Sequence, residues 1–272
     1  MKTVIELWQE IVNKMINTIV EIGLNHLGKF EEVIQYLNVL LDTKVDGIEF
    51  QVRDDIFYER IEKKDLELSN DEYKQICDLI HKENKSFGIA LTDITKVDFF
   101  ESIGTDFYKV IINDITNKPL VRVLCETGKK VLISTGLSSD KDIQNVVELV
   151  SQYPNVVLNH TQLSNEPSDS NLKAINTMRD KYNMPVSFGS HCNNHNILYM
   201  SLCFNPSDIL FYVKNESIAK VDWEQRGFTY PDDKHAILLD DVKYVVNNIQ
   251  SLSGAVGSGI KEKMNNKLKV NK

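Results

Sequence analysis

Short apolar runs alternate with amphipathic segments along most of the chain. An apolar run at residues 16–22 is followed by a segment at 29–41 with apolar residues at helical spacing, and then by a second apolar run at 45–52. The other predicted strands are 86–91, 107–112, 130–134, 155–160, 184–189 and 208–213, and the other predicted helices are 71–83, 97–103, 118–126, 139–151, 171–181, 194–204 and 238–252. Eight near-continuous apolar strands joined by helices predict an α/β fold, a single-domain (β/α)8 TIM barrel. A doubly wound open sheet is the alternative, but the sequence has no Gly-rich phosphate loop of the usual pattern.

The two ends of the chain differ from the barrel pattern. Residues 1–17 mix apolar residues with Glu6, Glu10 and Lys14 at helical spacing, which predicts a helical extension and not a signal peptide. The barrel is predicted to span residues 18–252. The remaining segment, 253–272, is rich in Gly, Lys and Asn, and its composition predicts a flexible tail.

The bulk composition narrows the class of protein. Hydrophobic residues make up 42% and charged residues 26% of the chain, as in ordinary soluble globular proteins. The net charge of -8 argues against nucleic-acid or anionic membrane partners. The four cysteines are widely spaced without a CxxC pair, which argues against a zinc ribbon or a disulfide framework and fits a cytoplasmic protein.

Polar side chains gather where the predicted strands end. In a parallel barrel these ends meet at one mouth, where such barrels place their chemistry. Lys109 is expected to point into this mouth, where it would bind an anion or form a Schiff base. The loop that begins at Ser134 offers hydroxyls and backbone N–H groups to a phosphate or carboxylate. The strand-end residues are Glu21, Asn25, His26, Glu49, Gln51, Arg53, Lys109, Ser134, Thr135, His160, Ser190 and His191.

One pair of histidines has a spacing that suits a metal. His191 and His195 would both reach one ion if they lay on a single helical turn. Asn193 and Asn194 between them favour a loop and a helix start instead.

Several stretches, taken in order, resemble the sialic acid synthase family. They are VEIGLNHLG, VDGIEFQ, LELSNDEYKQI, FYKV followed by DITNKPL, KKVLISTGLSS, NLKAINTM, MPVSFGSH and PDDKHAILLDD. The resemblance implies a (β/α)8 barrel that condenses phosphoenolpyruvate with an N-acetylmannosamine-type amino sugar, using a divalent metal such as manganese or magnesium. Members of that family usually continue into a small antifreeze-like domain that reaches into a partner subunit, which this chain is expected to lack. The resemblance is also compatible with a homodimer.

The resemblance also assigns roles to individual positions. The family has a lysine and an STG-motif serine that contact phosphoenolpyruvate, and a metal-binding histidine that follows the seventh strand. The matched positions are Glu21, Lys109 and His235 as catalytic residues, Gln51, Ser134, Asp114 and His160 as substrate-binding residues, and His191 as a metal ligand.

Five positions depart from the family pattern, and they fall on the chemistry. One of them is Asp114, where the family has the longer glutamate. Glu49 stands where the family has a lysine, which at about 4 Å and an effective dielectric near 20 would change the interaction with an anionic substrate by several kcal/mol. Ala90 and Ile112 stand where a threonine and a serine are expected. Val213 matches the position of the second metal-binding histidine, so a metal would be weakly held unless a carboxylate replaced that ligand.

These departures leave three functional hypotheses. The first is a divergent synthase that uses phosphoenolpyruvate and an amino sugar. The second is a catalytically degenerate barrel that acts as a binding or regulatory subunit. The third is a different reaction at the same mouth, with Glu49 as a base or metal ligand near His26, His160 and His191.

Overall fold

The structure is a computed structural model that describes residues 16–60, 64–216, 232–257 and 259–261. The predicted N-terminal helix falls on residues 1–15 and therefore lies outside the described residues. Most of the predicted tail, at 258 and 262–272, lies outside them as well. Within the described part of the chain, no helix is long and apolar enough to cross a membrane.

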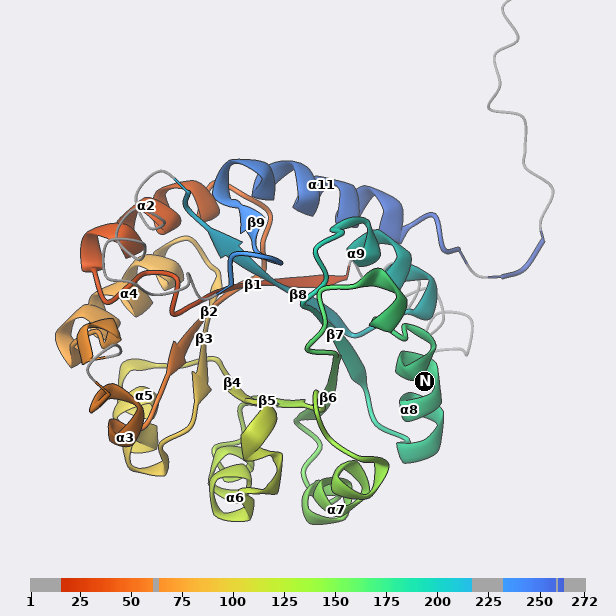
Figure 1. Cartoon of the computed structure of the whole chain (residues 1–272), viewed down its shortest axis with the longest axis horizontal. Helices are drawn as coiled ribbons and strands as arrows, with labels where there is room; N and C mark the ends of the chain where they lie inside the picture. The colour runs from red at the N-terminus through yellow and green to blue at the C-terminus, as the bar shows by residue number, and fades with distance from the viewer. Residues whose placement is uncertain (1–15, 61–63, 217–231, 258, 262–272) are drawn as a thin grey trace, which may run out of the picture.

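Eight parallel strands form a closed ring with helices around it (Figure 1), and the predicted (β/α)8 barrel is confirmed. Each strand pairs with the next along the chain, and β1 also pairs with β8 to close the barrel. The strands are β1 (Asn17–Gly23), β2 (Gly47–Val52), β3 (Ser86–Leu91), β4 (Phe107–Val110), β5 (Lys130–Ser134), β6 (Val156–Thr161), β7 (Val186–Ser190) and β8 (Asp208–Lys214).

The helices follow the predicted ranges with small shifts at their ends. They are α2 (Phe30–Leu40), α4 (Asn70–Lys82), α5 (Val97–Ile103), α6 (Lys118–Glu126), α7 (Asp140–Val150), α8 (Lys173–Tyr182), α9 (Asn196–Ser201) and α11 (Val242–Ser253). Ser69 and Ser139 start α4 and α7 through capping boxes, which satisfy backbone N–H groups that the first helical turn leaves free.

The sequence pattern did not reveal the shortest elements. These are α3 (Asp55–Tyr58), strand β9 (Ile237–Leu238), which pairs in parallel with β8, and the 3-10 turns η1 (Lys64–Leu66), η2 (Ile94–Lys96), η3 (Ile112–Thr116), η4 (Pro167–Asp169), η5 (Leu202–Phe204) and η6 (Leu239–Asp241). Elements of two to five residues are too short to show a hydrophobic period.

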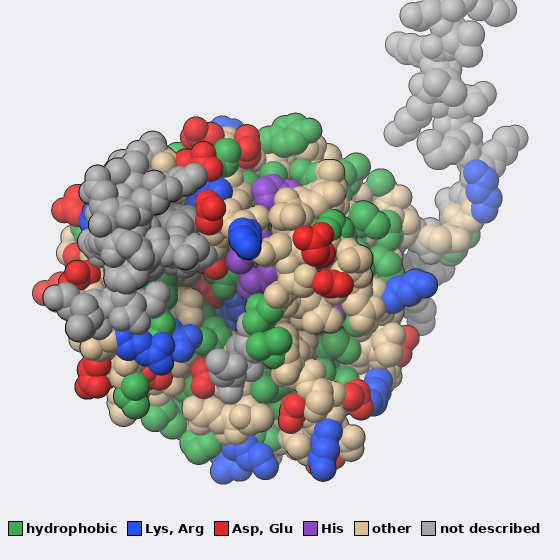
Figure 2. Space-filling view, viewed as in Figure 1, with side chains coloured by type: hydrophobic (Ala, Val, Ile, Leu, Met, Phe, Trp, Pro, Cys, Tyr) green, Lys and Arg blue, Asp and Glu red, His purple; other side chains and the backbone are tan. Residues whose placement is uncertain are grey.

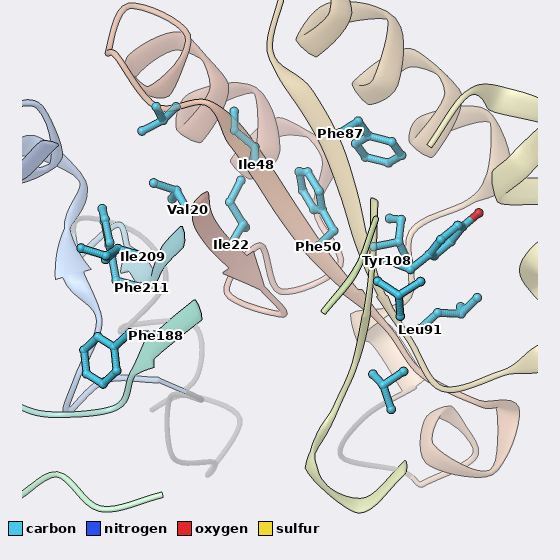
Figure 3. Close-up of a cluster of buried hydrophobic side chains, with 14 of the residues drawn as sticks. Val20, Ile22, Ile48, Phe50, Phe87, Leu91, Tyr108, Phe188, Ile209 and Phe211 are labelled. Atoms are coloured by element: carbon cyan, nitrogen blue, oxygen red, sulfur yellow. The ribbon is translucent and has the colours of Figure 1, made fainter. Parts of the chain in front are cut away.

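The barrel has an outer and an inner apolar layer. Strand residues alternate between the two faces, and one set packs beneath the helices, including Val20, Ile48, Phe50 and Phe211 (Figure 3). The other set fills the middle of the barrel and consists of Ile19, Phe107, Leu132, Val157 and Leu210.

A glycine makes room for the largest side chain of this inner layer. A β-carbon on Gly88 would lie 2.0 Å from the ring of Phe107, far inside van der Waals contact. Because β3 has no side chain at this point, the ring of Phe107 can lie over β3 and pack in the inner layer. The inner apolar layer thus forms the floor of the mouth, and polar side chains nearer the carboxyl ends of the strands line its walls.

Candidate active site

The side chains that line the mouth come from the strand positions just beyond the inner apolar layer. Positions two residues beyond the inner apolar layer face the same way, because side chains alternate along a strand. These positions are Glu21, Glu49, Lys109, Ser134, Asn159 and Tyr212. Figure 2 shows the molecular surface from the same direction as Figure 1, with histidine side chains around a hollow near the centre.

Lys109 lies between two carboxylates at the centre of the mouth. Its Nζ donates a hydrogen bond to Glu21 and another to Oε1 of Glu49 at 3.3 Å. The three side chains are only 6%, 2% and 1% exposed, in the order Lys109, Glu21 and Glu49. Burial alone would lower the pKa of Lys109, but the charges of Glu21 and Glu49 outweigh it and the pKa is raised. A permanently charged ammonium suits the predicted anion contact and not the predicted Schiff base.

Glu49 is the less well paired of the two carboxyl groups. Burial raises its pKa to about 8, the charge of Lys109 opposes this, and the charge of Glu21 adds to it. Its Oε2 atom is buried and has no hydrogen-bond partner among the residues that the structure describes. A buried carboxylate oxygen without a partner is costly, so the protonated acid is favoured at neutral pH.

Three aromatic rings lie beside Lys109 and its two carboxyl groups. The ring centroids of His191 and His235 are 4.6 Å apart, and the Tyr212 ring lies 5.4 Å from His191 and 5.2 Å from His235. Nδ1 of His191 is 2.9 Å from the hydroxyl of Thr161, which fixes the ring and leaves Nε2 for another contact. Burial lowers the pKa of His191 to about 3, with smaller effects from His235 and Lys109, so its imidazole is neutral.

Two histidines beside the mouth have ring nitrogens that a ligand could contact. Nε2 of His235 is buried without a hydrogen-bond partner in the described residues, and Oδ1 of Asp232 lies 3.4 Å from it. No group of three or more His, Cys, Asp or Glu side chains within those residues is arranged to hold a metal ion. The predicted pair of His191 and His195 does not share a helical turn, because His191 lies in the preceding loop and His195 is the N-cap of α9.

The prediction that Val213 occupies the missing metal-ligand position needs correction. Val213 is fully buried in the outer apolar layer with Phe211, and its carbonyl accepts a hydrogen bond from Asn25 at 2.7 Å. The neighbouring residue that faces His191 in the mouth is Tyr212. A shift of one residue along a strand exchanges its two faces, so sequence matching alone mistook the outward position for the inward one. Burial raises the pKa of Tyr212 well above its usual range, which makes the phenol a poor metal ligand.

Two predicted histidines lie outside the mouth. His160 faces the helices, with Nε2 3.0 Å from the carbonyl of Ser170 and its ring against Phe188 of the outer layer. His26 packs near Phe50, also of the outer layer, and its Nδ1 accepts from the backbone N–H of Gly28 at 3.0 Å. The structure therefore does not bring His160 to the substrate side, nor His26 or His160 next to Glu49.

Three other predicted substrate contacts lie at or near the mouth. Gln51 follows Glu49 on the same face of β2, and Ser134 is 2% exposed on β5. Asp114 lies in η3 at the end of β4, where burial raises its pKa and the charge of Arg53 opposes this. Asp114 is thus placed towards the end of β2.

The sequence analysis missed two residues that face the mouth. Tyr212 packs between the histidines and Lys109, whose Nζ is 5.7 Å from the phenol ring centroid. Asn159 accepts a hydrogen bond from Ser187 at 3.0 Å, and its amide lies where a β-carbon on Gly189 would clash. Counting two residues along each strand from Leu210 and Val157 would have found both positions.

A comparison with known protein families identifies the family of this chain. The NeuB family matches residues 15–205, which is more than half of the chain. The chain belongs to the NeuB family. This confirms the resemblance to sialic acid synthases that the motifs indicated.

Relatives in this family include enzymes with named products. N,N'-diacetyllegionaminic acid synthase of Campylobacter jejuni is 22% identical over 272 residues, covering 90% of this chain and 78% of that protein. The protein of the same name from Legionella pneumophila is 24% identical over 281 residues, with 93% and 76% covered. A solved structure of N-acetylneuraminic acid synthetase from Leptospira borgpetersenii, in complex with citrate, has the same fold with a TM-score of 0.81 and 23% identity, covering 93% of this chain and 88% of that one.

Proposed function

We propose that this NeuB-family chain is an enzyme that condenses phosphoenolpyruvate with the aldehyde of an N-acetylmannosamine-type amino sugar, giving a nonulosonic acid and phosphate. The observation that supports this most is Lys109, which lies buried at the centre of the mouth beside Glu21 and the histidine pair. The names of the relatives agree with this class of product.

The side chains of the mouth suggest a division of roles. Lys109 and Ser134 would hold the carboxylate or phosphate of phosphoenolpyruvate, and Gln51 and Glu21 would contact the sugar. The terminal methylene carbon of phosphoenolpyruvate would form a bond to the aldehyde carbon, and His235 would supply the proton that the aldehyde oxygen then needs. Water would add to the neighbouring carbon that carries the phosphate, and loss of phosphate from that carbon would leave a 2-keto acid.

A divalent cation, manganese or magnesium, is part of the proposal. His191 would hold it through the ring nitrogen that Thr161 leaves free, with water or substrate as the other ligands. When bound, the cation would polarise the aldehyde oxygen of the sugar. The cytoplasm is the proposed compartment, because the four cysteines Cys77, Cys125, Cys192 and Cys203 are free thiols.

Two measurements test the proposed function. Phosphate release from phosphoenolpyruvate is followed with a panel of N-acetylated hexosamines, with and without manganese. Thermal unfolding is followed with phosphoenolpyruvate, manganese and both together, since a ligand at about a hundred times its Kd stabilises by roughly 2.7 kcal/mol. Phosphate release with one sugar is expected, and the proposal fails if no sugar gives release and no ligand raises the melting temperature.

A second candidate function is a binding or regulatory barrel without this reaction. The contact of Glu49 with Lys109 favours it, because a second carboxylate competes with an anionic substrate for the same ammonium. Under this alternative, Lys109→Ala would leave the binding of a partner protein unchanged. Under the proposed function, the same substitution abolishes phosphate release.

A further inference from the structure

The two carboxyl groups at Lys109 are not equivalent. Glu21 accepts hydrogen bonds from Lys109 and from the phenol of Tyr212. Glu49 accepts from Lys109 at 3.3 Å and shares a side-chain hydrogen bond with Glu21, and no described donor reaches its buried Oε2. Glu21 therefore has two hydrogen-bond donors, whereas Glu49 has one and lies beside a second carboxyl group.

Among the described residues, no second positive charge faces Glu49. β1 contributes Glu21, β4 contributes Lys109 and β8 contributes Tyr212. The adjacent strand β3 contributes Gly88 beside Glu49 and Ala90 beside Gln51, neither of which is charged. Within the part of the chain that the structure describes, one ammonium thus faces two buried carboxyl groups. Two ionised carboxylates would leave an uncompensated buried charge, which one proton removes.

We propose that Glu49 binds the anionic substrate as a neutral carboxylic acid, donating its O–H to a carboxylate or phosphate oxygen beside Lys109. This inference rests on the proposed function. In this arrangement the acid hydrogen takes the place of one hydrogen of an ammonium, so a glutamate serves where a lysine would otherwise bind the anion. The unpartnered Oε2 of Glu49 then has a partner, and Lys109 remains shared between Glu21 and the ligand.

The proposal makes anion binding depend on one proton. At a pH where Glu49 is already protonated in the free protein, the affinity for phosphoenolpyruvate does not depend on the ionisation of Glu49. At higher pH the free site is ionised, so binding takes up a proton from the solvent and the apparent Kd rises by about tenfold per pH unit. The turning point lies near the pKa of Glu49, about 8.

Calorimetric titration with phosphoenolpyruvate between about pH 7 and pH 9.5 tests this dependence, and repeating it in buffers of different ionisation enthalpy counts the protons taken up. The wild type, Glu49→Gln and Glu49→Lys are compared. The expected result is a Kd that rises at high pH in the wild type with uptake of one proton, and a Kd that is flat over the same range in both variants. A flat Kd in the wild type, or an equal rise in Glu49→Gln, overturns the proposal.

Two further outcomes separate this inference from the proposed function. Binding by Glu49→Lys with none by the wild type at any pH would show that Glu49 excludes the anion, which overturns the inference and favours the regulatory barrel. No binding by any of the three proteins would refute the proposed function and the substrate contact of Glu49 with it. Infrared spectra of the free protein at pH 7 give a separate readout, because the carbonyl band of a protonated acid must be present in the wild type and lost in Glu49→Gln.

Discussion

Two lysines enter the interior of the barrel from opposite ends, and their surroundings differ. Lys130 at the start of β5 contacts Asp208 at the start of β8, and this lysine side chain is 32% exposed. Asp208 also accepts from Asn17 at 2.8 Å, so its charge has several partners. Lys109 at the other end is 6% exposed and shares its charge between Glu21 and Glu49.

The difference suggests that the charged groups at the amino end of the barrel stabilise the fold, whereas those at the carboxyl end are available to a ligand. The pair at the amino end has one cation for one carboxylate and access to water, as expected of a contact that only stabilises the fold. At the carboxyl end, among the described residues, the single ammonium of Lys109 faces two buried carboxyl groups, and Glu49 Oε2 and His235 Nε2 are buried without hydrogen-bond partners. These two atoms lie at the end of the barrel where such folds place their chemistry, and a ligand there could contact both.

The largest effect is expected for Lys109→Ala. It removes the shared cation, so phosphate release and the thermal response to phosphoenolpyruvate should disappear, and stability should fall by about 3 kcal/mol as two carboxyl groups lose their partner. The matched variant Lys130→Ala should keep the response to phosphoenolpyruvate and lose about 1 kcal/mol, because that lysine is partly solvated. Urea denaturation and ligand-dependent melting check both. Equal effects of the two variants on ligand response would break the comparison between the two ends.

The next effect concerns the pH dependence of stability at the carboxyl end. The pKa of Glu49 is raised from 4.5 to about 8 by burial, so the folded state holds a proton that the unfolded chain releases. The stability due to Glu49 is therefore full below about pH 4.5 and is lost as the pH rises through about 8. Glu49→Gln should become more stable relative to the wild type over this interval, by a few kcal/mol in urea denaturation.

A surface substitution provides the control for this pH series. Glu31→Gln makes the same change of side chain at an exposed carboxylate on α2 and is measured over the same pH range. A constant difference for Glu49→Gln would mean that Glu49 is ionised in the folded protein.

The sequence predicted the barrel well because its period is local. β3 and β5 were predicted to the residue, since each is a continuous apolar run between polar turns. The same alternation explains the errors at the mouth. Val213 and Tyr212 are neighbours, and only the position of Leu210 in the inner layer shows which of them faces inward.

The contact between Lys109 and Glu49 was beyond the sequence for another reason. The two residues are on strands that do not touch, and β3 lies between them. Their approach depends on the register of two strand pairs and on the small residues Gly88 and Ala90 on the intervening strand. Matching to a family revealed the charge reversal at Glu49, but not that Lys109 would compensate it.

The middle of the barrel should give a smaller effect, limited to stability. Gly88→Ala places a β-carbon 2.0 Å from the ring of Phe107, and the overpacking should cost about 3 kcal/mol without direct contact with a ligand. Gly254→Ala is the control, because no atom lies within 4 Å of its β-carbon position, and it should change stability by less than about 0.5 kcal/mol. Adding Phe107→Leu to Gly88→Ala should recover part of the loss. No recovery would mean that the backbone of β3, and not the ring, opposes the alanine.

The smallest effect is expected at the amino end, for Asp208→Asn. The asparagine keeps the size of the side chain and the hydrogen bond from Asn17, but it no longer offsets the charge of Lys130. Because Lys130 reaches water, the loss should be about 1–2 kcal/mol in urea denaturation, and the response to phosphoenolpyruvate should not change. Asp208→Asn combined with Lys130→Met should restore most of the stability, since it removes the unpaired charge as well. A loss of ligand response in Asp208→Asn would show that the apolar layer around Phe107 transmits changes from one end to the other, and the two ends could then no longer be treated as independent.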